Sequence, residues 1–553
     1  MNTSAGSAFN NSVLLNSICD HLDNTELLCM MRTSRLGFGT AASRIWRDLD
    51  DIEPLLKLLA LTTEHTKVKT ETLMKVTLPA FSPEIFTRFN CYSAFVQKLL
   101  VTNQWYIDKS DNTFCSFKLQ PWSTLSLQAQ RAPLLPNLES LKFAQLFSDE
   151  NEVVLWISVL VSPSLKTLDL RGLRSTLSHL GTATVLGLLT QNTPNLKKIS
   201  HHLTVVPSTD DTAFLEKSAA SQLVLSPLAR GHLQNSQHLV HLDIGGQFID
   251  STTFLELSRL PKLEHLSIEQ LSNEDSSLAK IFNNIQLPAN SFPSLQKLQL
   301  DFSVLDDIVA AWNVKPFVSG LTTVVLLYNT ENPRVRTIYD NDVLNLILPI
   351  ISASSPHITQ LTLDSVESLG SEPLSKKLRN APWTHMGRLS LSYLELNHFD
   401  ADAASFKNVQ QIWPHLVVLA IPTQTLTFQH LVYLSRLPKL EEILAHGLED
   451  MGKVPETQCQ CSSPLRTIEF DEMFNDWVGA ESIENVARFL LKLWPELERV
   501  VCTDTSAKVK SELELLNTYI RVIQGVAKTK DKIAACYGPN AIQRLLHESL
   551  ASF

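Results

Sequence analysis

The chain has 553 residues, of which 44% are hydrophobic and 19% are charged. This length is too great for one ordinary hydrophobic core, and this composition excludes a mostly disordered chain. The formal net charge of −10 argues against a nucleic-acid-binding protein, because such proteins concentrate Lys and Arg to neutralise phosphates.

Residues 10–50 predict a small helical module. Leu14, Leu15, Ile18 and Leu22 follow one another at helical spacing, so we expect them on one face of a first helix. The segment 23–25 offers caps and a turn, after which a second helix can begin. A further run ends at residues 43–49 and closes the module.

Residues 51–135 are interpreted as linker helices followed by a degenerate capping repeat. Helices are predicted at Leu55–Leu61 and at Phe81–Phe95. The run Val96–Val101 is predicted to be the strand of a first, imperfect repeat.

One pattern recurs through residues 136–510: a Pro or polar stop followed by x-L-x-x-L-x-L or a close variant. Pro163-Ser-Leu-Lys-Thr-Leu-Asp-Leu170 and Pro261-Lys-Leu-Glu-His-Leu-Ser-Ile268 are clear cases, and Met386-Gly-Arg-Leu-Ser-Leu391 is assigned as another. The repeats return at intervals of roughly 24 to 43 residues, most of them between about 24 and 32, a period typical of solenoid proteins. The alternating apolar residues predict a short strand with one buried face. Helices are predicted between these strands at 152–160, 183–189, 253–260, 342–351, 404–413, 428–434 and 482–494.

Such a unit cannot bury its leucines alone, so the repeats must stack. The pattern resembles the leucine-rich repeats of long, irregular type. That resemblance implies an α/β solenoid with parallel strands on a concave face and helices on a convex face. Residues 511–553 break the pattern and predict a C-terminal helical cap of two helices, separated near Tyr537-Gly-Pro539.

The order of elements in residues 10–50 resembles the F-box. The residues that match the F-box pattern are Ile18, Leu22, Leu27, Leu28, Arg35, Trp46 and Leu49. Asn10 and Asn11 stand where the family has Leu-Pro, and Val13 replaces an acidic residue. Followed by leucine-rich units, this module resembles the F-box and leucine-rich-repeat receptors of SCF ubiquitin ligases. The segment Ile52-Glu-Pro-Leu-Leu-Lys-Leu-Leu59 resembles members from basidiomycete fungi.

The resemblance implies that the F-box docks on a Skp-type adaptor, which in turn binds the cullin, while the repeats hold an unknown protein substrate. The adaptor-binding residues that it implies are Leu14, Leu15, Ile18, Leu22, Leu27, Leu28 and Trp46. An alternative is a non-enzymatic interaction scaffold without ligase association, in which these helices only cap the solenoid. The two hypotheses differ in whether these side chains stay exposed or pack against residues 50–100.

No motif of a known enzyme class occurs in the sequence. Gly-x-Ser-x-Gly, the P-loop and Gly-x-Gly-x-x-Gly are absent, and Gly245-Gly246 is interpreted as a turn after a strand. Cys459-Gln-Cys461 and His201-His202 lack partners at the spacing of a structural zinc site. We therefore expect no catalytic residue, cofactor or metal.

The positions between the repeat leucines are expected to face outward and form the substrate surface. The candidate residues are Lys142, Lys166, Lys197, Lys198, His241, His265, Lys297 and Arg388. The early lysines favour an acidic or phosphorylated peptide, whereas a mixed solvated surface is the alternative.

The eight cysteines are too sparse for a disulfide scaffold, which favours a reducing compartment. The first residues lack the features of a signal peptide, and no apolar run approaches the roughly 20 residues that span a bilayer. The sequence therefore predicts a cytoplasmic or nuclear protein without membrane or nucleic-acid partners.

Overall fold

The computed structural model of the chain describes residues 12–537 apart from several short segments. The segments outside the description are 60–61, 69–70, 103, 109–112, 145–149, 172, 174–176, 178, 201–224, 226, 270–277, 303–304, 330–340, 367–375, 379–382, 398, 402, 450–462, 472–479 and 504–506. The described chain divides into two units, Met1–Leu295 and Gln296–Phe553, and each is treated by itself.

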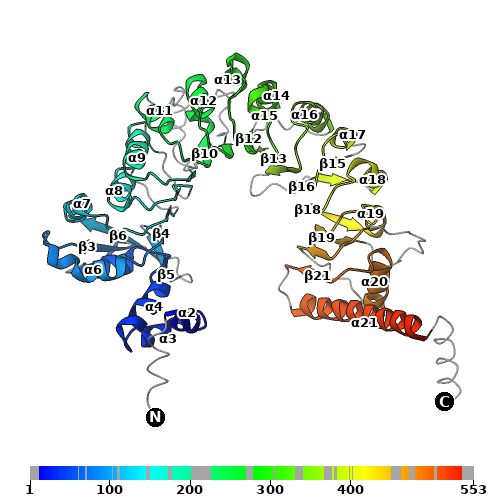
Figure 1. Ribbon diagram of the computed structural model, residues 1–553, viewed down its shortest axis with the longest axis horizontal. Coiled ribbons are helices and arrows are strands. Elements are labelled where there is room, and N and C mark those ends of the chain that lie inside the picture. Colours follow the sequence, from blue (N-terminus) through cyan, green and yellow to red (C-terminus); the bar gives the residue numbers. More distant parts are fainter. Residues whose placement is uncertain are drawn as a thin grey trace, which may run out of the picture. The chain divides into compact units, whose positions relative to one another are not determined.

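Unit 1 begins with a bundle of three helices, α2 (Ser12–Cys19), α3 (Asn24–Met30) and α4 (Arg35–Ile45) (Figure 1). A capping box starts α3, because the Asp23 carboxylate accepts from the Glu26 amide at 2.8 Å and Glu26 accepts from the Asp23 amide at 3.0 Å. Cys19, Leu27 and Ala41 form the core of this bundle. The three helices therefore have a small hydrophobic core of their own.

The segment after this bundle contains a sheet that the sequence analysis missed. Strands β2 (Thr62–Val68), β3 (Glu71–Thr77), β6 (Thr113–Gln120) and β5 (Gln104–Asp108) lie side by side in that order. Only β3 and β6 are parallel. The two predicted helices are shorter than expected: one is α5 (Glu53–Lys57), and the other is η1 (Pro83–Ile85) followed by α6 (Phe86–Ser93). A further helix, α7 (Trp122–Arg131), was not predicted. The prediction of a linker made of helices was wrong for residues 62–68, 71–77, 104–108 and 113–120, which form strands.

The rest of unit 1 repeats one strand and one helix at a time. Its parallel strands follow the order β1 (Asp48–Leu49), β4 (Lys98–Val101), β7 (Ser140–Phe143), β8 (Thr167–Asp169), β9 (Lys198–Ser200), β10 (His241–Gly245) and β11 (His265–Glu269). The intervening helices are α8 (Glu150–Leu160), α9 (His179–Asn192), α11 (Pro227–Gln234), η2 (Gly246–Phe248), α12 (Ser251–Leu257) and α13 (Leu278–Asn284). The predicted first strand at Val96–Val101 is confirmed as β4, and the predicted turn at Gly245-Gly246 is confirmed where β10 passes into η2.

Unit 2 repeats the same strand-and-helix plan. Its main strands are β12 (Lys297–Phe302), β13 (Thr323–Asn329), β14 (Gln360–Val366), β16 (Tyr393–Asn397), β18 (Val418–Thr427), β19 (Glu442–Glu449), β20 (Thr467–Phe470) and β21 (Arg499–Cys502). A separate pair is formed by β15 (Lys376–Leu378) and β17 (Phe399–Ala401). The helices are α14 (Leu305–Asn313), α15 (Lys315–Val318), α16 (Asn341–Ser354), α17 (Trp383–Met386), η3 (Ala403–Phe406), α18 (Val409–Ile412), α19 (Phe428–Leu434), α20 (Ala480–Leu493) and α21 (Ala507–Tyr537).

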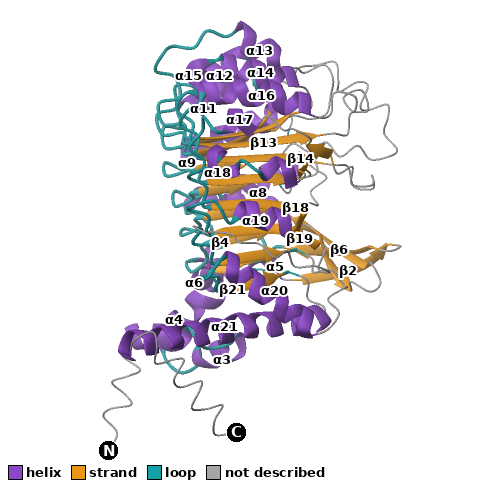
Figure 2. Ribbon diagram, turned by 90° about the vertical axis from the view of Figure 1, so that its right-hand side faces the viewer, coloured by secondary structure: helices purple, strands orange, loops and turns teal. Residues whose placement is uncertain are grey.

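The parallel register stacks equivalent apolar residues into rows. In unit 1, Leu168 lies opposite Leu141 and Ile199, and Leu242 lies opposite Leu266. These side chains are at most 4% exposed, so each contributes roughly 2 kcal/mol of hydrophobic free energy. In each unit the helices lie on one side of the strands, which leaves the other side as a strand face (Figure 1). Within a unit the main strands run side by side (Figure 2). This confirms the predicted α/β fold of leucine-rich-repeat type.

One repeat was predicted in the wrong register. The strand assigned to Met386–Leu391 lies instead at β16, and Leu394 pairs with Leu361 of β14. The spacing Leu391, Leu394 and Leu396 fits the motif as well as Met386, Leu389 and Leu391 does, so spacing alone does not choose between them. Residues 383–386 form the short helix α17 instead.

A side chain of α21 hydrogen-bonds to the outer edge of β21, the last strand of unit 2. Asn517 Nδ2 donates to the Val500 carbonyl at 2.8 Å, and Asn517 Oδ1 accepts from the Val500 amide at 2.9 Å. Gln524 Nε2 donates to the Leu497 carbonyl at 2.8 Å. The helix begins earlier than the predicted cap, at Ala507, and ends at the predicted break, Tyr537. The second predicted helix lies outside the described residues.

Candidate functional site

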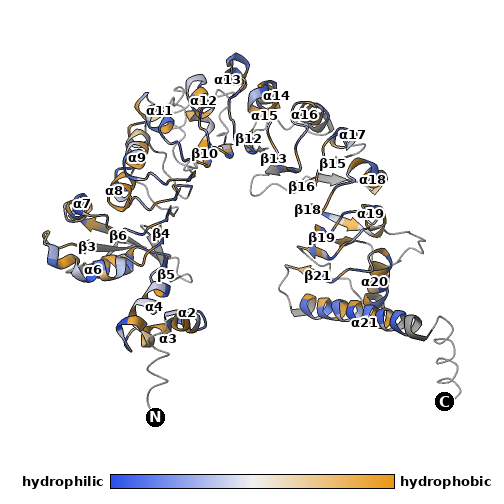
Figure 3. Cartoon of the chain, viewed as in Figure 1, coloured by the Kyte–Doolittle hydropathy of each residue, from blue (hydrophilic) through white to orange (hydrophobic). Residues whose placement is uncertain are grey.

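Apolar side chains of α2 and α3 lie exposed on the N-terminal helical bundle. Leu14 is 47% exposed and Ile18 is 38% exposed, and the two follow one helical turn apart on α2. Leu28 of α3 is 51% exposed. Figure 3 shows hydrophobic stretches, in orange, on the helices of this bundle. We name Leu14, Ile18 and Leu28 the apolar docking residues.

The other leucines predicted to bind the adaptor lie in or against the core of the bundle. Leu15 and Leu27 are buried, and Leu22 packs partly buried against the same core. The assignment of Leu15 and Leu27 as contact residues is therefore corrected, because both support the bundle from inside. Leu22 keeps part of its surface exposed, so its assignment stays a prediction. Helical spacing had grouped Leu14 with Leu15, but neighbours in a helix point about 100° apart, and here Leu14 faces solvent while Leu15 faces the interior.

Trp46 also contacts the chain itself. Its ring lies 4.6 Å from that of Tyr92, centroid to centroid, and Phe38 lies 5.8 Å from the same tyrosine ring. The bundle is joined to the first repeat strands by β1, which pairs with β4 through Asp48 and Lys98. The Lys98 ammonium lies 3.3 Å from the Asp48 carboxylate.

The candidate substrate residues fall mostly on the strand faces or at the strand entrances. Lys142, Lys166 and Lys197 are exposed, and Lys166 forms an ion pair of 2.7 Å with Glu139. Lys297 begins β12 in unit 2. Arg388 is a correction, because it lies in the turn after α17 and not on a strand.

Three strand-face residues of unit 1 converge in one cluster. The parallel register places His241 between Lys198 and His265. The His241 and His265 ring centroids are 3.8 Å apart, and His241 Nε2 lies 2.6 Å from Asp243 Oδ1. The ligand atoms of His241, Asp243 and His265 all lie within 4.8 Å of one another. We name these three residues the histidine–aspartate cluster.

The Asp243 carboxylate is kept ionised in spite of its burial. Its side chain is 8% exposed, and burial alone would raise its pKa. The hydrogen bond with His241 and the nearby Lys198 charge outweigh burial and hold the pKa below its usual value. A buried carboxylate with its charge retained can bind a cation.

A second buried carboxylate lies two strands away. Asp169 accepts from Arg171 Nη2 at 2.8 Å and from Nε at 3.0 Å, a bidentate pair. Burial would raise the pKa of Asp169, but the hydrogen bonds and charge of Arg171 lower it overall.

The strand face of unit 2 carries a hydrogen-bonded polar network. Glu395 accepts from the Tyr393 hydroxyl at 2.9 Å and from the Thr362 hydroxyl at 3.1 Å, while Asn397 donates to it at 3.2 Å. Burial, together with the Glu395 carboxylate, raises the pKa of Tyr393 to about 12. The tyrosine therefore stays protonated and acts as a hydrogen-bond donor.

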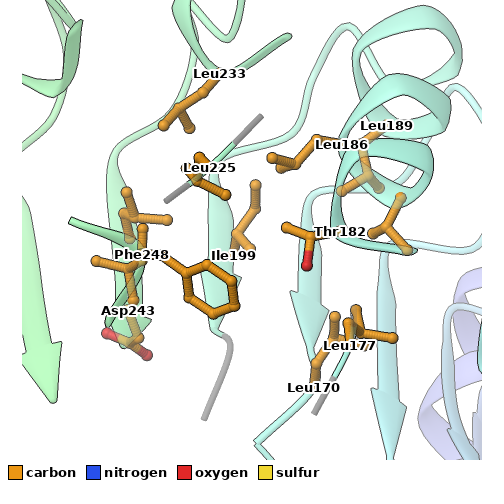
Figure 4. A pocket seen from close by; sticks show the side chains of 13 residues that line it. Leu170, Leu177, Thr182, Leu186, Leu189, Ile199, Leu225, Leu233, Asp243 and Phe248 are labelled. Carbon is orange, nitrogen blue, oxygen red and sulfur yellow. The ribbon is translucent and has the colours of Figure 1, made fainter. Parts of the chain in front are cut away.

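An apolar cavity of about 50 Å³ lies behind the strands of unit 1 (Figure 4). Leu189 of α9, Leu233 of α11 and Ile199 of β9 line it, and Asp243 lies at its edge. It has the size of a packing defect between repeats.

The two metal candidates considered from the sequence, His201-His202 and Cys459-Gln-Cys461, lie outside the described residues. Within the described ranges, no helix is both long and apolar enough to cross a membrane.

The repeated strand and helix, with their stacked leucine rows, define a protein of leucine-rich-repeat fold. No family model matches the sequence, and no curated protein matches it. Among solved structures, the chain is similar to one described as the crystal structure of the TLR13–ssRNA13 complex, with 14% identity and a TM-score of 0.32. The match covers 78% of this chain and 67% of that chain.

Proposed function

We propose that the chain is the substrate-recognition subunit of an SCF-type ubiquitin ligase. In this proposal the N-terminal bundle binds the Skp-type adaptor, the adaptor binds the cullin, and the strand faces hold a protein substrate. The chain itself carries out no bond chemistry. It acts by proximity, because holding the substrate beside a charged ubiquitin-conjugating enzyme raises the effective concentration of the reacting groups.

The exposure of Leu14, Ile18 and Leu28 is the observation that carries this proposal. These large apolar side chains lie on a bundle whose core is already formed by Cys19, Leu27 and Ala41. They are not needed to fill that core. Apolar helix faces left in water favour a protein partner, which buries them by packing its own helix or groove against them.

The scaffold hypothesis is supported by a different observation. Trp46 packs on Tyr92, and β1 pairs with β4, so the bundle is attached to the following segment as a cap would be. The two observations concern different residues. Attachment through Trp46 leaves Leu14, Ile18 and Leu28 exposed, so capping and adaptor binding are compatible.

The decisive experiment is co-purification of the full chain with a Skp-type adaptor. We expect capture by the native chain and its loss in the Leu14→Asp, Ile18→Asp double variant, whose changed side chains point into solvent. The matched control is Leu127→Asp, Leu228→Asp, which alters exposed leucines of α7 and α11 that are 44% and 61% exposed. Circular dichroism checks that all three chains fold.

Equal capture by all folded chains would show that the adaptor does not contact this face of α2. Absence of capture by the native chain would reject the ligase proposal and leave the interaction scaffold.

A further inference from the structure

We propose that His241, Asp243 and His265 form a binding site for a divalent transition-metal ion on the strand face of unit 1. The proposal does not depend on the ligase function, because none of the three residues belongs to the N-terminal bundle. Imidazole nitrogen and carboxylate oxygen are a ligand set that suits zinc and other first-row metals.

The backbone brings the ligands together without any special loop. His241 and Asp243 are two residues apart on β10, so their side chains leave the same face of the sheet. His265 lies directly opposite His241 on β11. A parallel ladder therefore places two ligands from one strand beside a third from the next.

The strands that carry the ligands are fixed by their buried faces. Leu242 is 3% exposed and Leu266 is fully buried, so neither strand can rotate without exposing its leucine. At the end of β10, a Cβ atom on Gly246 would lie 3.3 Å from the Glu269 carbonyl oxygen. The absence of a side chain at Gly246 permits this close approach, and Gly245 still pairs with Glu269, so β10 and β11 stay in register beyond the ligands. A preorganised site loses little free energy on binding.

The observed distances are compatible with one metal ion. Tetrahedral zinc, with bonds of about 2.0–2.2 Å, separates its ligand atoms by about 3.3 Å. The three ligand atoms lie within 4.8 Å of one another, and the closest pair, His241 Nε2 and Asp243 Oδ1, is 2.6 Å apart. Insertion of the ion replaces that hydrogen bond and opens the pair by less than an ångström.

The electrostatics of the cluster favour a cation. A divalent cation placed between the three ligand atoms is attracted by the Asp243 carboxylate and by the nitrogen lone pairs of two imidazole rings whose centroids are 3.8 Å apart. Lys198 opposes the metal, since it is a positive charge directly opposite His241 on the neighbouring strand. Removing the Lys198 charge is therefore expected to strengthen metal binding.

Three protein ligands leave a coordination position for water. His241 and His265 are partly exposed, so this position faces the solvent of the strand face. The pattern matches zinc sites that keep an open position, in contrast to closed structural sites with four protein ligands.

The test is a Zn²⁺ titration of the full chain, followed by competition with a chromophoric chelator. We expect one site whose affinity falls at least about 100-fold in His241→Gln and in His265→Gln, because each change removes a direct ligand. Lys198→Gln is expected to raise the affinity roughly threefold by removing a like charge. The matched control is His238→Gln, which changes an exposed histidine three residues from the site and leaves the affinity unchanged.

A second measurement on the native chain keeps the proposal testable if a variant fails to fold. X-ray absorption at the zinc edge is expected to show two imidazole nitrogens and no sulfur. Sulfur ligands would assign the ion to cysteines elsewhere in the chain and overturn the proposal. Equal affinity in His265→Gln and His238→Gln, with both chains folded, would overturn it as well.

Discussion

The indole of Trp46 lies 4.6 Å from the ring of Tyr92, and this contact attaches the N-terminal bundle to α6. Replacing either ring with leucine removes an aromatic contact worth about 1 kcal/mol beyond its buried area. A double-mutant cycle of Trp46→Leu and Tyr92→Leu, followed by chemical denaturation, is expected to give a coupling free energy of about 1 kcal/mol. A coupling near zero would mean that the rings do not hold the two segments together.

Two leucines of the bundle that are adjacent in sequence differ in burial. Leu15 is fully buried and Leu14 is 47% exposed. Leu15→Ala is expected to destabilise the bundle by about 3 kcal/mol, because it leaves a cavity, whereas Leu14→Ala changes stability by less than about 0.5 kcal/mol. Thermal unfolding of both variants measures the difference, and equal effects would contradict the observed orientation of α2.

Asp169 should make stability depend on pH. Its pKa in the folded chain is lowered below the ordinary 3.8, so its ion pair with Arg171 stabilises the fold above that pH and is lost as pH falls through the folded pKa. Asp169→Asn is expected to cost about 1 kcal/mol at neutral pH, a value reduced by the partial exposure of Arg171. Denaturation at several pH values should show this difference shrinking below about pH 4. A difference independent of pH would exclude the ion pair as its cause.

Ser355 satisfies two buried groups of unit 2. Its hydroxyl accepts from Trp312 Nε1 at 3.1 Å and donates to the Val318 carbonyl at 2.9 Å. Ser355→Ala is expected to destabilise unit 2 by about 2 kcal/mol, since the buried indole N–H loses its acceptor. The control is Ser435→Ala, an equally buried serine directly after α19 that donates to the Val432 carbonyl of that helix. Chemical denaturation should rank Ser355→Ala as clearly the more damaging change.

Asn517 should protect the last strand of unit 2. Asn517→Ala removes both hydrogen bonds to Val500, which leaves a strand edge with an unpaired amide and carbonyl. We expect a loss of about 2 kcal/mol and faster aggregation, measured by light scattering. Thr518→Ala, on the exposed side of the same helix, is expected to change neither quantity.

The repeats were predictable because each leucine row has a simple sequence period. Leu168, Leu242 and Leu266 were placed correctly from spacing alone. The sheet formed by residues 62–68, 71–77, 104–108 and 113–120 was missed in part because its first strand, Thr62–Val68, is almost wholly polar and shows no alternation of apolar side chains. The register predicted at Met386 was wrong because two overlapping sets of apolar residues have the same spacing. Only the pairing with β14 shows which set forms the strand.

The clusters were harder to predict than the fold. His241 and His265 were candidate surface residues, but Asp243 was not, because a carboxylate two residues from a histidine is common in any sequence. Their convergence depends on the parallel register of β10 and β11, which brings together residues 241 and 265. For the bundle, the sequence grouped Leu14, Leu15 and Ile18 on one face, and only tertiary packing shows which of them is buried.

The contact between Asn517 and Val500 also limits how this architecture can lengthen. The amide side chain occupies the two hydrogen-bonding positions that the strand of an additional repeat would need. A new repeat therefore cannot be appended after β21 unless α21 is displaced. Duplication or deletion of repeats during evolution, or in protein engineering, should succeed at internal positions. There the strands on either side of the change can still pair with a neighbour in the same parallel register.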